Sequence, residues 1–156
     1  MKSELGKGST FTLQFPTIIK AVRPKAIPDQ EQEIESKSLS ILVIDDEEAI
    51  CEILEYFLSE KGHLVRTANS GKEAIILIKD TDYDLVLCDM AMPDVYGYEV
   101  VKVLNKLEKR PKIGIITGWG EKLEHIGEED FEVDFIVKKP FNLSELTKDI
   151  NNAFNT

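Results

Sequence analysis

The sequence is poor in cysteine, in basic residues and in long apolar runs. Its 2 cysteines, Cys51 and Cys88, lie inside apolar patterns rather than at a metal-type spacing, so we expect reduced core thiols in a cytoplasmic protein. The 19 basic residues face 29 acidic ones, for a net charge of -10, which argues against direct binding to nucleic acid. No segment reaches the ~18 apolar residues of a membrane span. The N-terminus also lacks the continuous apolar region of a signal peptide, so we expect no membrane contact by this chain.

Short apolar runs alternate with helical periodicities from Ser40 onward, which is typical of βα units. Three runs are continuous and rich in branched residues, as in central strands of a parallel sheet that is covered on both faces. They are 41–44, 85–87 and 113–116, and two shorter runs, 64–65 and 135–137, complete five strands. The predicted fold class is therefore α/β, with a doubly wound five-stranded parallel sheet over residues 40–156.

Helical patterns fill the segments between these strands. The first is a stripe predicted to be buried, formed by Ala49, Ile50, Ile53, Leu54, Phe57 and Leu58, and Gly62 is well placed to end it. Ser70 and Glu73 form a capping-box pattern ahead of the second helix. The third helix is predicted over 95–107, and the last begins at Asn142. The Gly- and acid-rich segment 118–130 has the weakest pattern, which we interpret as a mobile fourth helix.

Residues 1–39 do not follow this alternation. They contain an extended-looking run, 10–15, followed by Pro24, Pro28 and the polar stretch 29–33, which is typical of a linker. The sequence thus predicts a domain boundary near Ser38.

Charged and polar residues follow the predicted strands. Because ligands bind outside the carboxyl ends of strands in an open parallel sheet, these residues are expected to meet at one edge. They are Asp45 and Asp46 after the first strand, Asp89 after the third, Thr117 after the fourth and Lys139 after the fifth. Three carboxylates at one edge would repel one another without a cation, and oxygen ligands of this kind suit Mg²⁺. A lysine and a hydroxyl beside them would suit a phosphoryl group, which a carboxylate near a metal can accept.

Each of these features also has an ordinary structural explanation. Asp45 and Asp46 alone would read as a helix N-cap, Thr117 as a turn residue, and Lys139 with Pro140 as a loop. Their joint arrival at the strand ends, in chain order, favours a functional site.

Four motifs together carry a resemblance to a known family. Residues 40–155 resemble the receiver domain of two-component response regulators through ILVIDDE, DLVLCDMAMPD with Gly97, IITG and KKPF, in the same order and spacing. The resemblance implies a flavodoxin-like (βα)5 fold in which Asp89 accepts a phosphoryl group from a phosphohistidine. The implied partners are a histidine kinase or a histidine phosphotransfer protein. The implied cofactor is Mg²⁺.

The resemblance also implies a role for each site residue. Asp45, Asp46 and Asp89 would bind Mg²⁺ together with the backbone carbonyl of Ala91. Thr117 and Lys139 would contact the phosphoryl oxygens, and the peptide bond between Lys139 and Pro140 would be cis.

The segment SELGKGSTFTLQFP looks like the end of a histidine-kinase ATP-binding domain, where a Gly-rich loop leads into a final strand. No DxGxG nucleotide box is present, and neither His63 nor His125 lies in a phosphoacceptor helix pattern, so we expect no kinase activity in this chain. The chain is interpreted as a receiver from a hybrid sensor histidine kinase, with residues 1–39 as a remnant of the ATP-binding domain plus linker. A flexible tail, or a gene that lost its kinase, is the alternative.

Three positions depart from the family pattern. Ala91 and Trp119 stand where polar side chains help to place the attacking water in receivers that lose phosphate quickly, so we expect slow self-dephosphorylation. The usual switch aromatic is replaced by Ile136. The neighbouring Phe135 is expected to point to the opposite face by strand alternation.

Two other functions compete with the phosphoacceptor reading. A Mg²⁺-dependent phosphohydrolase with aspartyl-phosphate chemistry would need a general acid or base near Asp89, and Ala91 and Trp119 supply none. A phosphorylation-silent interaction domain would be expected to show gaps in its site, whereas this set is intact. The sequence does not indicate an oligomeric state.

Overall fold

The computed structural model describes residues 2–4, 8–10, 38–118 and 131–155. The chain divides into two units, Met1–Glu35 and Ser36–Thr156. In the first unit, β1 (Lys2–Glu4) pairs antiparallel with β2 (Gly8–Thr10). Beyond Thr10, the predicted extended run over 10–15 and the linker lie outside the described residues.

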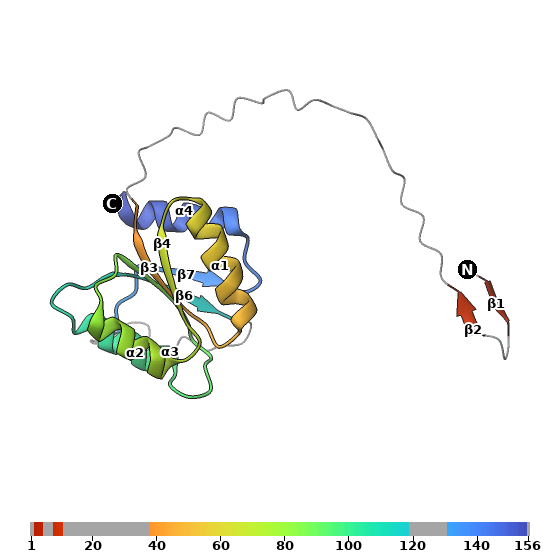
Figure 1. The fold of residues 1–156 in the computed structure, drawn as a ribbon, viewed down its shortest axis with the longest axis horizontal. Coiled ribbons are helices and arrows are strands. Elements are labelled where there is room, and N and C mark those ends of the chain that lie inside the picture. Colours follow the sequence, from red (N-terminus) through yellow and green to blue (C-terminus); the bar gives the residue numbers. More distant parts are fainter. Residues whose placement is uncertain (1, 5–7, 11–37, 119–130, 156) are drawn as a thin grey trace, which may run out of the picture. The chain divides into compact units, whose positions relative to one another are not determined.

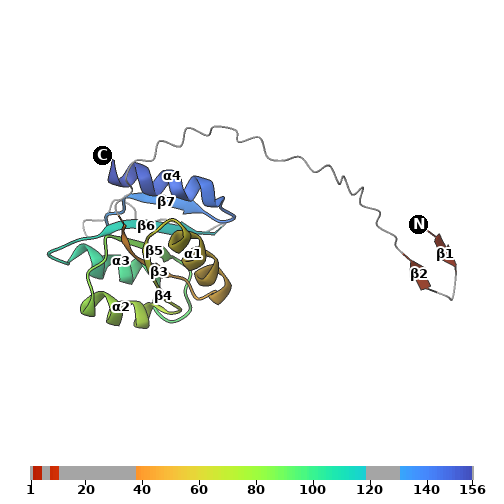
Figure 2. The same ribbon diagram turned by 45° about the horizontal axis from the view of Figure 1, so that its top comes forward.

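The second unit is built on a five-stranded sheet in the order β4-β3-β5-β6-β7, and every neighbouring pair is parallel (Figures 1 and 2). The strands are β3 (Ser40–Ile44), β4 (Leu64–Ala68), β5 (Leu85–Asp89), β6 (Lys112–Thr117) and β7 (Phe135–Lys138). Numbered within the sheet, this order is 2-1-3-4-5, the doubly wound order of flavodoxin-like folds. The predicted fold class is confirmed.

Helices cover both faces of the sheet (Figures 1 and 2). The helices α1 (Glu48–Glu60) and α4 (Leu143–Phe154) lie on one face, and α2 (Gly71–Asp80) and α3 (Gly97–Asn105) lie on the other. The third helix is shorter at both ends than the predicted 95–107. The fourth helix predicted over 118–130 lies outside the described residues from 119 onward. None of the helices in the described ranges is long and apolar enough to cross a membrane.

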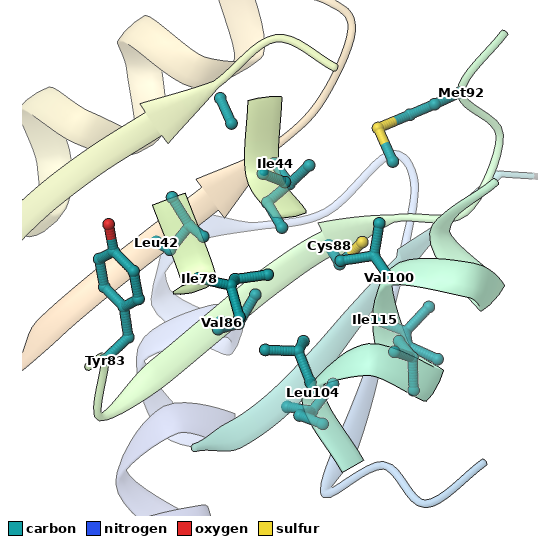
Figure 3. Close-up of a cluster of buried hydrophobic side chains, with 14 of the residues drawn as sticks. Leu42, Ile44, Ile78, Tyr83, Val86, Cys88, Met92, Val100, Leu104 and Ile115 are labelled. Carbon is teal, nitrogen blue, oxygen red and sulfur yellow. The ribbon is translucent and has the colours of Figure 1, made fainter. Parts of the chain in front are cut away.

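The core has two clusters, one on each face of the sheet. Figure 3 shows the cluster under α2 and α3, where Met92 is 1% exposed beside Cys88 and the branched residues of β3 and β5. The other cluster packs β3, β5 and β7 against α1 and α4. Ile136 packs against the first cluster and Phe135 against the second, so the predicted alternation of β7 is confirmed.

The predicted buried stripe of α1 is partly wrong. Cys51, Leu54 and Leu58 are the buried residues, whereas Ile53 is 51% exposed and Ala49 is also exposed. Cys51 packs in the core at the start of the helix, so the buried face of α1 runs through Cys51, Leu54 and Leu58. Both cysteines are free and buried, as expected, and burial raises the pKa of the Cys51 thiol to about 11.

Two helix starts have the predicted side-chain caps. Ser70 Oγ accepts a hydrogen bond from the amide of Glu73 at 3.2 Å, and the Glu73 carboxylate accepts one from the amide of Asn69 at 2.9 Å. At α4, Asn142 Oδ1 accepts a hydrogen bond from the amide of Ser144 at 2.8 Å. These bonds satisfy amides that have no partner within the helix, and they fix where each helix leaves the sheet edge.

Candidate functional site

Three carboxylates meet at the carboxyl edge of the sheet. Asp45 follows β3 directly and Asp89 is the last residue of β5; they are 0% and 2% exposed, whereas Asp46 is exposed. One carboxylate oxygen from each of the three lies within 4.8 Å of the other two. The structure thus brings together the acidic residues that the sequence placed at the ends of two neighbouring strands.

Lys139 connects the two buried carboxylates. Its Nζ lies 2.9 Å from Asp45 Oδ2 and 2.9 Å from Asp89 Oδ1, and 3.5 Å from Glu47 Oε1. Because a buried charge is costly unless it is paired, this ammonium group compensates carboxylates that would otherwise repel each other. The lysine follows β7, so the contact joins residues that are 94 positions apart in the chain.

Burial and charge act in opposite directions on the acid at the centre of the site. Burial raises the pKa of Asp89 above its usual value, although the hydrogen bond and charge of Lys139 act to lower it. Burial is the largest single effect on Lys139 and acts to lower its pKa, but the hydrogen bonds and the charges of Asp89 and Asp45 together outweigh burial and raise the pKa. Lys139 therefore remains a cation at neutral pH.

Thr117 and Ala91 lie at the same edge. Thr117 is the buried last residue of β6, and its carbonyl oxygen accepts a hydrogen bond from the amide of Lys139 at 2.7 Å. The amide of Ala91 donates a hydrogen bond to Asp89 Oδ2 at 2.9 Å. The peptide bond between Lys139 and Pro140 is cis, as the resemblance implied.

The donor set suits a small divalent cation. All three side chains offer oxygen, and Mg²⁺ prefers oxygen ligands at about 2.1 Å, so ligands on opposite sides of the ion lie about 4.2 Å apart. The spread of up to 4.8 Å is about 0.6 Å wider than that. Asp45 Oδ2 and Asp89 Oδ1 already contact Lys139, so a cation bound there would compete with the ammonium group for these oxygens.

Sequence reasoning missed two side chains near this edge. Glu47 approaches Lys139, and its amide donates to Asp45 Oδ1 at 2.9 Å, but it reads in the sequence as one more acid before α1. Asp94 accepts hydrogen bonds from the first amides of α2, those of Gly71 and Lys72, which lie 23 and 22 positions earlier in the chain. No local sequence pattern predicts this pairing.

An apolar groove of about 560 Å³ lies beside Lys139, lined by Ile50, Ile53, Lys139, Pro140, Phe141 and Leu143. Its walls come from α1 on one side and from the start of α4 with its preceding loop on the other. The groove therefore shares Lys139 with the acidic site.

His63 lies away from the acidic site. His63 Nδ1 accepts a hydrogen bond from the amide of Leu39, which precedes β3 at the opposite end of that strand from Asp45. His125 and Trp119 lie outside the described residues.

A comparison with protein families matches residues 41–151 to the response regulator receiver domain. The match covers more than half of the chain. The chain therefore belongs to the response regulator receiver family.

Similar proteins of known identity agree with this assignment. The response regulator SaeR of Staphylococcus aureus is 37% identical over 116 residues, which are 72% of this chain and 49% of SaeR. The chain thus matches about half the length of that relative. Among solved structures, the receiver domain protein of Clostridium thermocellum has a TM-score of 0.67 and 30% identity, covering 74% of this chain and 94% of the other. TrrA of Thermotoga maritima, solved in complex with Mg²⁺-BeF, has a TM-score of 0.63 and 34% identity, covering 73% of this chain and 97% of TrrA.

Proposed function

We propose that this chain is a phosphoacceptor in a two-component phosphorelay and that Asp89 receives the phosphoryl group. The observation that carries the proposal is the buried Asp89 carboxylate, held 2.9 Å from the Lys139 ammonium group among two further acids. A carboxylate oxygen of Asp89 would attack the phosphorus of a phosphohistidine. The phosphorus–nitrogen bond breaks, an acyl phosphate forms, and the histidine leaves with its electron pair.

Asp45, Asp46, Asp89 and the carbonyl of Ala91 would hold Mg²⁺. The cation supplies positive charge that offsets the negative charge of the phosphoryl oxygens. The Mg²⁺-BeF complex of TrrA, a relative with 34% identity, supports this part of the proposal.

Lys139 and Thr117 would act on the transferred group. Lys139 already forms an ion pair with Asp89, so its ammonium group can pair with an oxygen of a phosphoryl group attached to that carboxylate. Thr117 is a hydroxyl donor at the end of the neighbouring strand. Both would stabilise the acyl phosphate once it has formed.

The phosphoryl donor would be a histidine kinase or a histidine phosphotransfer protein in the cytoplasm. The apolar groove beside Lys139 supports this proposal, because a donor must place its histidine close to Asp89 and can bury apolar side chains on Ile50 and Ile53. For residues 1–39 we propose an origin in the end of a kinase ATP-binding domain, which would make the parent protein a hybrid sensor kinase.

The test is intact-protein mass spectrometry after incubation with acetyl phosphate and Mg²⁺. We expect a single phosphoryl addition in the wild-type protein. The addition should be absent when Mg²⁺ is chelated and absent in Asp89→Ala. If Asp89→Ala gains the same mass, another residue is the acceptor. If the wild-type protein gains none from acetyl phosphate or from a purified phosphohistidine protein, a phosphorylation-silent interaction domain becomes the better description.

The phosphorylated state is expected to last for minutes or longer. Ala91 offers no polar side-chain atom to orient a water molecule at the acyl phosphate, and an indole at position 119 would have no group suited to placing that water. Following the added mass after removal of the donor gives the lifetime. Ala91→Asn should shorten it by about tenfold, because the amide can hold a water molecule near the phosphorus. A wild-type lifetime of a few seconds would contradict this expectation.

An assay for inorganic phosphate separates the remaining alternative. A phosphohydrolase would release inorganic phosphate in many turnovers from a phosphomonoester, whereas a phosphoacceptor forms one stable adduct for each chain. The side chain of Ala91, two residues after Asp89, has no acidic or basic group that could serve as the extra acid or base.

A further inference from the structure

The loop between β5 and α3, residues 90–96, is bound to the start of helix α2 by Asp94. Asp94 Oδ1 accepts a hydrogen bond from the amide of Gly71, and Oδ2 accepts one from the amide of Lys72, each at 3.2 Å. These are the first amides of α2, which have no partner within the helix, and the helix dipole favours a carboxylate there. Hydrogen bonds from the amides of Val95, Lys72 and Gly71 lower the pKa of Asp94, so it is ionised at neutral pH.

A second contact joins loop 90–96 to the first turn of α2, between Val95 and Gly71. A Cβ atom added to Gly71 would lie 2.6 Å from Val95 Cβ and 2.7 Å from the Val95 carbonyl oxygen. Glycine at position 71 therefore allows the loop backbone to approach α2 closely. Met92, in the middle of the loop, is 1% exposed in the core cluster under α2 and α3.

The other end of the loop is attached to the acceptor carboxylate. The Ala91 amide donates to Asp89 Oδ2 at 2.9 Å, and the Gly97 amide donates to the carbonyl of Met90 at 3.3 Å. Ala91, whose carbonyl is proposed as a metal ligand, lies three positions before Asp94. The loop around it is therefore attached to Asp89 of β5 at one end and to the first amides of α2 at the other. Apart from the buried Met92, the loop is largely solvent-facing, with Ala91, Asp94 and Tyr96 all exposed.

We propose that Asp94 is a positioning residue for the metal site. By binding the amides of α2, it holds loop 90–96 in one conformation and thereby keeps the Ala91 carbonyl at the edge of the acidic site. This inference rests on the proposed function, because it requires that the carbonyl is a ligand. Ordering the loop before the cation binds removes a conformational cost from binding, so the anchor contributes to affinity without contacting the ion.

A matched control exists on the same helix. Ser70 also caps α2, but its hydroxyl oxygen accepts its hydrogen bond from the Glu73 amide within the helix start rather than from loop 90–96. A residue that merely caps α2 would affect stability in the way that Ser70 does. Asp94→Ala and Ser70→Ala therefore remove one cap each, and only the first releases the loop. Asp94→Asn keeps an acceptor oxygen and should recover part of the effect.

The first measurement is the affinity for Mg²⁺ alone, by calorimetric titration of the three variants and the wild-type protein. We expect Asp94→Ala to weaken Mg²⁺ binding by about tenfold, Ser70→Ala to change it less than about twofold, and Asp94→Asn to fall between them. Equal affinities for Asp94→Ala and the wild-type protein, or equal losses in Asp94→Ala and Ser70→Ala, would overturn the inference.

The second measurement needs no metal. Hydrogen exchange of the amides of loop 90–96 should be faster in Asp94→Ala than in Ser70→Ala, including the Ala91 amide that bonds to Asp89. Unchanged exchange in Asp94→Ala would overturn the anchoring role itself. If the wild-type protein fails to bind Mg²⁺ while the exchange result is as expected, the anchor stands and the proposed metal site is what fails.

Discussion

Replacing Lys139 with alanine should lower the free energy of unfolding by about 3 kcal/mol in metal-free buffer. The substitution leaves Asp45 and Asp89, which are 0% and 2% exposed, without the ammonium group that lies 2.9 Å from each. Most of this loss comes from the buried negative charge that remains. Once the lysine is removed, the two carboxylates have neither water nor a cation beside them. Urea unfolding in the presence of a chelator measures this difference.

Lys138→Ala is the matched control. Lys138 is the adjacent lysine and its side chain is exposed, so its removal should change the free energy of unfolding by less than about 0.5 kcal/mol.

The loss of stability in Lys139→Ala should become smaller on acidification. The pKa of Asp89 is raised in the folded protein, so its protonation favours the folded state and removes the uncompensated charge. Added Mg²⁺ should also restore part of the stability, because a cation would again neutralise the carboxylates. Equal unfolding midpoints for the two lysine variants would contradict this account.

Gly97→Ala should destabilise the fold by about 3 kcal/mol or more and abolish phosphoryl transfer with it. A Cβ atom at this position would lie 2.9 Å from Met90 Cα and 3.0 Å from the carbonyl carbon of Asp89, with the Asp89 carbonyl oxygen closer still. All three obstacles are backbone atoms, so no side-chain rotation can relieve the clash. The backbone of Asp89 or the start of α3 must move, which displaces the Asp89 carboxylate.

Gly62→Ala provides the comparison for Gly97→Ala. Gly62 has φ of +88° after α1, and a Cβ atom there would meet nothing within 4 Å, so the cost is only that of a left-handed conformation, about 1 kcal/mol. Thermal or urea unfolding of both variants, together with the mass measurement, tests the difference. A Gly97→Ala variant no less stable than Gly62→Ala would show that the approach of α3 to Asp89 is not a fixed requirement.

The sheet and its acidic edge could be predicted because they follow from local patterns. Continuous branched runs gave the central strands, and the rule for the carboxyl edge of a parallel sheet brought Asp45 and Asp89 together. The burial of individual helix positions was harder to predict. Ile53 fits the helical period as well as Leu54 does, yet it faces the groove, because the sheet under α1 meets the side of the helix that carries Cys51.

Contacts between distant segments had no local signal. The capping box at Ser70 lies within four residues and was predicted, whereas the Asp94 cap of the same helix depends on how the loop after β5 folds back. The approach of α3 to Asp89 is of the same kind: a glycine in a motif indicates that space is short, but only the folded chain shows which backbone occupies it.

The two neighbours on β7 determine what kind of movement this domain can transmit. Ile136 packs with the cluster under α2 and α3, and Phe135 packs with the opposite one. A β-branched side chain is stiff about its first torsion, so Ile136 cannot swing between an inward and an outward position as a planar ring does. If Asp89 is phosphorylated as proposed, the hydrogen bond from the Lys139 amide to the Thr117 carbonyl is a route by which the change could reach the ends of β6 and β7. On the proposed function, such a signal would depend on the hydrogen-bonded strand ends rather than on the orientation of an aromatic ring at position 136.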